Sequence, residues 1–191
     1  DTTGRAWSWG DGLGGDLGVD DAAFATGPGA CRDASGGPCS ATPLPVSMPA
    51  DVRFTALAAG IGYDAALDAG GHVWTWGSNL QGALGLVNTS TTCSATCTVP
   101  VGQSGPVSTF NSSPTMIAGP TNVRFVAIAV TQSHQGAEAN TVALDSHGVA
   151  WAWGANTSLH QPSSSLSPCF DATGQPSPSA PGVELCVPVS Y

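Results

Sequence analysis

The feature that most constrains this chain of 191 residues is a signature, Trp-x-Trp-Gly, that occurs three times, each time shortly after another glycine. The copies end at Gly10, Gly77 and Gly154. Their second tryptophans, Trp9, Trp76 and Trp153, stand 67 and 77 residues apart, and such a period is typical of repeat architectures. The chain is therefore expected to be an array of similar units.

Further motifs recur in a fixed order around the signature. Val-Arg-Phe and then Ala-Leu-Asp precede the second and third copies, and a Gly- and Leu-rich segment follows the first two, at 12–18 and 79–85. The third copy has lost these glycines. The array divides on this basis into a first unit, 1–67, a second unit, 68–144, and a partial third unit, 145–191.

The residues between turns have the chemistry of strands. Residues 73–76 and 123–128 are rich in β-branched and aromatic side chains, and in 52–58 apolar residues alternate with Arg53 and Thr55. Gly71 and Gly148 stand where the chain must turn between strands. No segment shows the apolar stripe of a long amphipathic helix.

These motifs resemble the regulator of chromosome condensation repeat family, most strongly from Val52 to Gly85. Within that family, the chain resembles the secreted bacterial variants. The resemblance implies an all-β fold of propeller blades, each a small antiparallel sheet. About two and a half repeats are fewer than a closed ring needs, so we expect an incomplete propeller, or part of a larger array, with long disulfide-bearing loops.

Composition limits the functions open to such an array. The formal net charge is −9 with only four basic residues, which argues against a nucleic-acid partner. No nucleophile elbow or His-Glu-x-x-His pair is present, so we expect neither an enzyme nor a cofactor. Guanine-nucleotide exchange, the activity of the family's namesake, is the least favoured function, and no apolar stretch is long enough for membrane insertion.

The cysteines indicate an oxidising compartment. All six lie in insertions between the repeat motifs, and nearest-neighbour pairing is favoured among the fifteen possible connectivities. The expected pairs are Cys31 with Cys39, Cys93 with Cys97, and Cys169 with Cys186. We therefore expect an extracellular or cell-surface protein. The sequons at Asn88, Asn111 and Asn156 are candidates for glycosylation.

Candidate metal ligands are better explained as repeat structure. Four carboxylates crowd one Gly-rich stretch, at Asp11, Asp16, Asp20 and Asp21, but their spacing does not fit a calcium loop. Histidines stand at His72, His134, His147 and His160, the first and third of them at strand turns. We expect no metal site, although histidines contributed by different repeats remain an alternative.

The tryptophans are expected to form the repeat core. Within each Trp-x-Trp both rings lie on one side of a strand and are predicted to pack between neighbouring blades. The residues are Trp7, Trp9, Trp74, Trp76, Trp151 and Trp153. The alternative is an exposed aromatic row that stacks on carbohydrate.

Three interpretations explain the broken repeats at the two ends of the array. The chain is a segment of a longer protein, a trimmed mature protein, or a subunit whose blades are completed by the next chain. We expect a non-enzymatic extracellular scaffold or adhesive protein, whose sharper form is a filament or surface layer built head-to-tail from copies of itself.

The alternative function is a protein-binding or enzyme-inhibitory module that uses its loops, by resemblance to secreted propellers of the family. The candidate exposed aromatic residues for such a rim are Phe24, Phe110, Phe170 and Tyr63.

Overall fold

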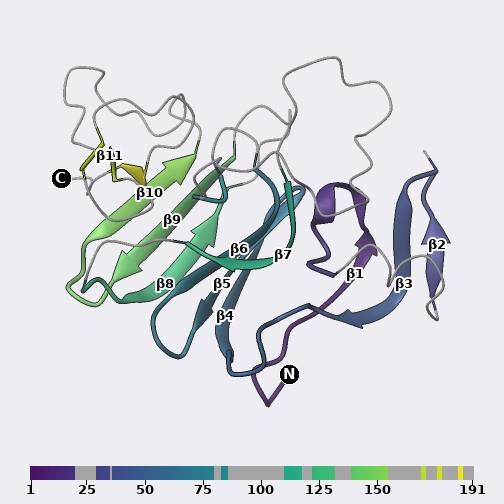
Figure 1. Ribbon diagram of the computed structural model, residues 1–191, viewed down its shortest axis with the longest axis horizontal. Helices are drawn as coiled ribbons and strands as arrows, with labels where there is room; N and C mark the ends of the chain where they lie inside the picture. The colour runs from purple at the N-terminus through teal and green to yellow at the C-terminus, as the bar shows by residue number, and fades with distance from the viewer. Residues whose placement is uncertain are drawn as a thin grey trace.

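The computed structural model is an all-β array of small antiparallel sheets that lie side by side (Figure 1). It describes residues 1–19, 29–34, 36–79, 83–85, 110–117, 122–131 and 139–154, and the backbone of residues 169–170, 176–177 and 185–186. Helical structure in this part of the chain is limited to the single 3-10 turn η1 (Leu13–Gly15). No helix there is long and apolar enough to cross a membrane.

The first sheet has three strands in the order β1-β3-β2. Its strands are β1 (Trp7–Asp11), β2 (Ala30–Arg32) and β3 (Pro38–Pro45). β1 pairs with β3 along one side and forms the edge of the sheet on the other.

The second and third sheets have four strands each, in the orders β4-β5-β6-β7 and β8-β9-β10-β13. The second contains β4 (Phe54–Ala59), β5 (Tyr63–Asp68), β6 (Val73–Ser78) and β7 (Phe110–Met116). The third contains β8 (Phe125–Val130), β9 (Asn140–Asp145), β10 (Ala150–Gly154) and β13 (Leu185–Cys186). A separate ribbon joins β11 (Cys169–Phe170) to β12 (Pro176–Ser177).

The repeated motifs form equivalent strands. Each Trp-x-Trp-Gly copy is a strand, β1, β6 or β10, and each Ala-Leu-Asp motif ends the strand before it, β5 or β9. The turns between these strands contain Gly71 at φ +81° and Gly148 at φ +83°, as their position in the repeat predicts. The four-stranded sheets thus run from residue 54 to residue 116 and from residue 125 to residue 186. The division of the chain into repeat units after residues 67 and 144 stays a prediction.

Glycines that end the tryptophan strands let backbones approach closely. A Cβ at Gly77 would lie 2.5 Å from the carbonyl oxygen of Gly62, and the site of Gly154 is equally crowded by Ala139. The equivalent Gly10 has nothing within 4 Å of such an atom. The first sheet has no described strand in the place that β5 and β9 take beside β6 and β10.

The apolar core lies between consecutive sheets. Six buried side chains join the first sheet to the second, and seven join the second to the third. The first group is Ala6, Val46, Phe54, Ala66, Trp74 and Trp76. The second group is Leu67, Val73, Ile117, Phe125, Ala143, Trp151 and Trp153.

Candidate protein-binding face on the first sheet

The second tryptophan of a copy joins its own sheet to the preceding one. Trp76 Nε1 donates a hydrogen bond to the carbonyl oxygen of Asp16 at 3.0 Å, and Trp153 Nε1 donates one to the carbonyl oxygen of Ala83 at 3.0 Å. We call the acceptor segments, 16–18 and 83–85, the Leu-Gly turns, because each ends in Leu-Gly. The two joints between the sheets therefore share one design.

Each Leu-Gly turn is held to its own sheet by the residue between the two tryptophans. Thr75 Oγ1 donates to the carbonyl oxygen of Leu84 at 2.7 Å, and Ser8 Oγ donates to that of Leu17. The third copy has Ala152 at this position and also lacks the Leu-Gly sequence. Loss of the hydroxyl thus accompanies loss of the Leu-Gly sequence.

The first tryptophan of each copy is bonded to an aspartate six residues earlier. Trp74 Nε1 donates to Asp68 Oδ2 at 2.9 Å, Trp151 Nε1 to Asp145 Oδ2 at 3.0 Å, and Trp7 Nε1 to Asp1 Oδ2 at 3.0 Å. The other carboxylate oxygen of each aspartate accepts backbone N–H groups of the turn that follows. These aspartates therefore hold the strand turns in shape.

Hydrogen bonds to the carboxylates also set their ionisation. Burial opposes ionisation of Asp68, but bonds from the backbone and ring of His72 and from Trp74 outweigh it and hold the pKa below its ordinary value. For Asp145 the bond from Trp151 is the main cause that lowers the pKa, against the opposing effect of burial. Both groups favour the folded state in their charged form.

Two tryptophans depart from the predicted repeat core. Trp74, Trp76, Trp151 and Trp153 are buried, as expected, whereas Trp7 is 43% exposed and Trp9 is 61% exposed. The reason is local, because no described sheet lies against the face of β1 that corresponds to the buried faces of β6 and β10. Trp76 and Trp153, the equivalents of Trp9, are only 3% and 1% exposed. The prediction of a core role for Trp7 and Trp9 is therefore wrong for the described chain.

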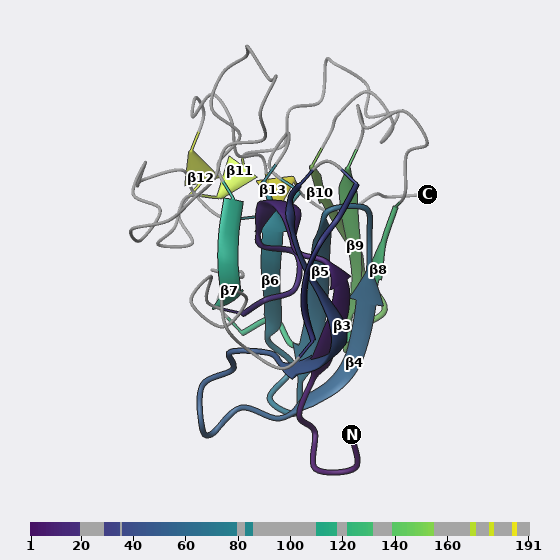
Figure 2. The ribbon, with the colours of Figure 1, turned by 90° about the vertical axis from the view of Figure 1, so that its right-hand side faces the viewer.

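The open face of β1 combines this aromatic surface with a free strand edge. β6 and β10 have a neighbouring strand on both sides, but among the described strands β1 pairs with β3 alone. Within the described residues, Trp9 Nε1 makes no hydrogen bond. Figure 2 views the molecule from the first sheet, with β1 and β3 facing the viewer. We define the β1 face as the outer edge of β1 together with Trp7 and Trp9.

Comparison with known proteins finds a family model that matches part of the chain. The family model of the regulator of chromosome condensation (RCC1) repeat matches residues 70–137, which run from the turn before β6 across β7 and β8. Residues 70–137 thus resemble one RCC1 repeat. A comparison with curated protein sequences finds no significant match.

Solved structures agree with this match in their fold. Yeast RCC1 (Prp20) bound to Kap60 superposes with a TM-score of 0.55 at 22% identity, over 78% of this chain and 28% of that protein. Human WBSCR16 superposes with a TM-score of 0.53 at 17% identity, over 80% of this chain and 29% of that protein. Saccharomyces cerevisiae Prp20p superposes with a TM-score of 0.53 at 21% identity, over 78% of this chain and 29% of that protein. The sheets are RCC1-type propeller blades, and the chain spans less than a third of the length of these proteins.

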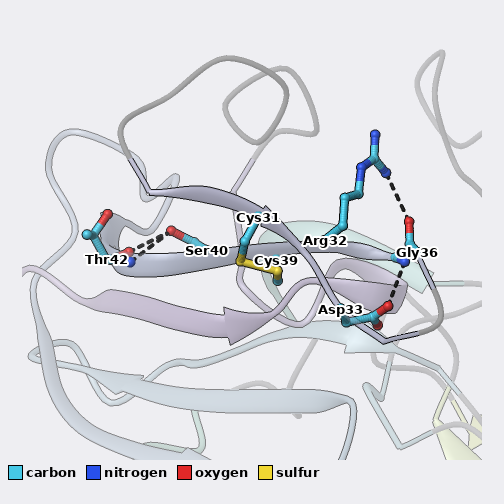
Figure 3. Close-up of a disulfide and its surroundings, with 8 residues drawn as sticks. Cys31, Arg32, Asp33, Gly36, Cys39, Ser40 and Thr42 are labelled. Atoms are coloured by element: carbon cyan, nitrogen blue, oxygen red, sulfur yellow. Dashed lines mark hydrogen bonds between the residues drawn. A yellow bond between two sulfur atoms is a disulfide. The ribbon is translucent and has the colours of Figure 1, made fainter.

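The RCC1-type blades carry one of the predicted disulfides. Cys31 and Cys39 are bonded, with their Cα atoms 4.9 Å apart, and they face each other across the paired strands β2 and β3 (Figure 3). Cys93 and Cys97 lie outside the described residues. Cys169 and Cys186 lie in β11 and β13, whose side chains are also outside the description.

The other predicted site residues that the structure describes are distributed over the blades. His72 and His147 are exposed in strand turns, and Asn111 lies half-buried in β7. Asn88, Asn156, His134, His160, Asp20 and Asp21 lie outside the described residues. The described part of the chain contains no group of three His, Cys, Asp or Glu side chains arranged to hold a metal ion.

The expected aromatic rim also needs correction at one residue. Tyr63 is only 1% exposed, and its hydroxyl donates to the carbonyl oxygen of Asn140 at 2.7 Å, from the second blade to the third. It was misassigned because the loop-like Gly-Ile-Gly before it hides the start of β5. Phe110 begins β7 and is half-buried, whereas Phe24 and the side chain of Phe170 are outside the description.

Sequence reasoning did not find one feature, a pair of carboxyl groups at the first joint. Burial raises the pKa of Asp16 to about 7, and the negative charges of Asp11 and Asp64 act in the same direction. Burial likewise raises the pKa of Asp64 to about 6, although N–H groups of Gly60 and Trp76 oppose it. Asp64 stands in β5, 48 residues after Asp16, so their proximity follows only from how the blades pack.

Proposed function

We propose that this chain is a non-enzymatic protein-binding segment of an RCC1-type propeller and that its β1 face is the binding surface. The observation that carries the proposal is the exposure of Trp9, 61% against 3% and 1% for its two equivalents. Tryptophan is among the residues that dominate the energetics of protein interfaces. The yeast relatives are described with protein partners, Kap60 in one case and Gsp1p and histones in the other, which supports the class of function.

The two closed joints indicate the chemistry of a partner. At each of them an indole N–H meets a backbone carbonyl oxygen of a Leu-Gly turn. Among the described strands none pairs with the outer edge of β1, and a strand of another chain could pair there. We propose as the sharper form that copies of this chain complete one another's blades head-to-tail and so build a filament or surface layer.

We also propose an extracellular or cell-surface location. The Cys31–Cys39 bond supports it, because disulfides persist mainly in oxidising compartments. The low positive charge, four arginines against 13 acids, is compatible with partners other than nucleic acids. A repeated fold with an exposed strand face supports a scaffold or adhesive role as part of the proposal.

Sedimentation velocity of the full chain over a range of concentrations tests the proposal. We expect concentration-dependent association that Trp9→Ala weakens by at least about tenfold, since a central interface tryptophan contributes roughly 2 kcal/mol or more. Val126→Ala is the matched control, because Val126 is an exposed apolar residue (57%) on β8 of another blade.

Two outcomes would count against this function. A wild-type chain that stays monomeric at every concentration contradicts head-to-tail assembly. Equal weakening by Trp9→Ala and Val126→Ala contradicts the β1 face as the contact. Carbohydrate binding is the second candidate, favoured by the exposed indole of Trp9, and a change in tryptophan fluorescence on addition of oligosaccharide to the monomer would identify it.

A further inference from the structure

The two joints between blades have the same geometry but different residues. At the second joint the carbonyl oxygen of Ala83 accepts two hydrogen bonds, from Trp153 Nε1 at 3.0 Å and from Thr141 Oγ1 at 2.9 Å. At the first joint the equivalent acceptor is the carbonyl oxygen of Asp16, which Trp76 Nε1 approaches to 3.0 Å. Asp64 takes the place of Thr141 in the repeat. Asp64 pairs with Trp76 across the strands of the second blade, as Thr141 pairs with Trp153 in the third.

This replacement changes what the side chain can donate. A threonine hydroxyl donates a hydrogen bond at any pH, but a carboxyl group donates one only when it holds a proton. The Asp64 position therefore reproduces the second joint only in its protonated form. The same joint also places a second carboxyl group, that of Asp16, where the second joint has the methyl group of Ala83.

No positive charge of the described residues contributes to the pKa shifts of the two carboxyl groups. In the two blades, β3, β4, β6 and β7 contain no acidic or basic residue, β1 contributes Asp11, β5 also contains Asp68, and the one basic residue of these strands is Arg32 in β2, which is paired with β3. N–H groups of Gly60 and Trp76 lower the pKa of Asp64, and backbone groups of its own turn lower that of Asp16, but burial outweighs them in both cases. Asp16 Oδ1 is nevertheless buried without a hydrogen-bond partner. Two negative charges at this joint would be poorly compensated.

We propose that the Asp16–Asp64 pair makes the joint between the first two blades pH-dependent, tight when the pair holds a proton and loosened when both carboxyl groups are ionised. The proton takes the role of the Thr141 hydroxyl hydrogen at the second joint. The described residues in the same places at the second joint, Ala83 and Thr141, include no such group, so we expect that joint to hold the second and third blades together over the same pH range. Acid thus strengthens one joint of the array and leaves the other unchanged.

The direction of the effect follows from proton binding. Unfolded Asp titrates near 3.8, whereas the pKa values of Asp64 and Asp16 in the folded chain are raised to about 6 and about 7. Between these values the folded state binds more protons, so stability falls as pH rises, by up to about tenfold in the folding equilibrium constant per pH unit for each group. Asp68 and Asp145 have lowered pKa values, so their ionisation changes the stability only below about pH 4, outside this window.

The test rebuilds the first joint with the residues of the second. Urea unfolding of the full chain is measured from pH 4.5 to pH 8 for the wild type, Asp64→Thr and Asp16→Ala. We expect the wild-type folding constant to fall through this range and the fall to be much shallower in both variants. At pH 8 we expect each variant to be more stable than the wild type. Asp51→Thr, which removes one exposed negative charge elsewhere, is the control and should keep the wild-type slope.

A second measurement keeps the proposal testable if a variant does not fold. The carboxyl ¹³C resonances of Asp16 and Asp64 in the wild-type chain should include at least one that titrates above pH 5.5. Wild-type pH dependence that persists in Asp64→Thr and Asp16→Ala would overturn the proposal. Titration of both carboxyl groups near pH 4 would overturn it as well.

Discussion

At the scale of single residues, the indole N–H of a second tryptophan is the donor that links one blade to the blade before it. Trp76 and Trp153 reach carbonyl oxygens at 3.0 Å, and the glycine that closes each Leu-Gly turn lies under the ring. A Cβ at Gly18 would lie 2.8 Å from Trp76 Nε1, and one at Gly85 would lie 2.9 Å from Trp153 Nε1. The Leu-Gly sequence is thus a requirement of the joint as well as of the turn.

Replacement of the joint glycine tests this requirement. Gly18 (φ +62°) and Gly14 (φ +80°) lie in the same segment, and both have a left-handed conformation, but a Cβ at Gly14 would meet nothing within 4 Å. Gly14→Ala should cost about 1–2 kcal/mol of unfolding free energy from its conformation alone. Gly18→Ala should cost about 1–3 kcal/mol more, because the methyl group displaces the indole. Equal losses in urea unfolding would contradict a role for Gly18 at the joint.

At the scale of strands and turns, most of what the sequence predicts is confirmed, because the relevant signals are local. The alternation in 52–58, the Ala-Leu-Asp ends and the turn glycines each depend on a few neighbouring residues, and they form β4, β5 and the turn before β6. The exposure of Trp9 and the burial of Tyr63 depend instead on whether another sheet lies alongside. A single repeat carries no information on that point.

Tyr63 provides a test of contacts between blades. Its buried hydroxyl donates from β5 to the carbonyl oxygen of Asn140 in β9, which also accepts the N–H of Thr131 at 2.8 Å. Because the carbonyl keeps this second donor, Tyr63→Phe should cost only about 0.5–1 kcal/mol in urea unfolding. A loss above about 3 kcal/mol would show that the ring itself is displaced, contrary to the contact described.

At the scale of the whole molecule, the described residues form a row of RCC1-type blades with two closed joints, and none of them covers the β1 face. The closed joints bury four tryptophans, and the open face exposes the remaining two. The sequence alone predicts the repeat, the all-β fold and the Cys31–Cys39 bond. It could not predict the β1 face or the Asp16–Asp64 pair, since both arise from how blades pack against each other.

The most direct test of the open face is the exchange of tryptophan indole N–H groups with solvent, followed by NMR on the dilute full chain. Trp76 and Trp153 should exchange slowly, because their N–H groups are buried and bonded to the Leu-Gly turns. Trp9 should exchange rapidly, and its exchange should slow at concentrations where the chain associates. Slow exchange of Trp9 in the dilute chain, matching that of Trp76, would contradict an open β1 face.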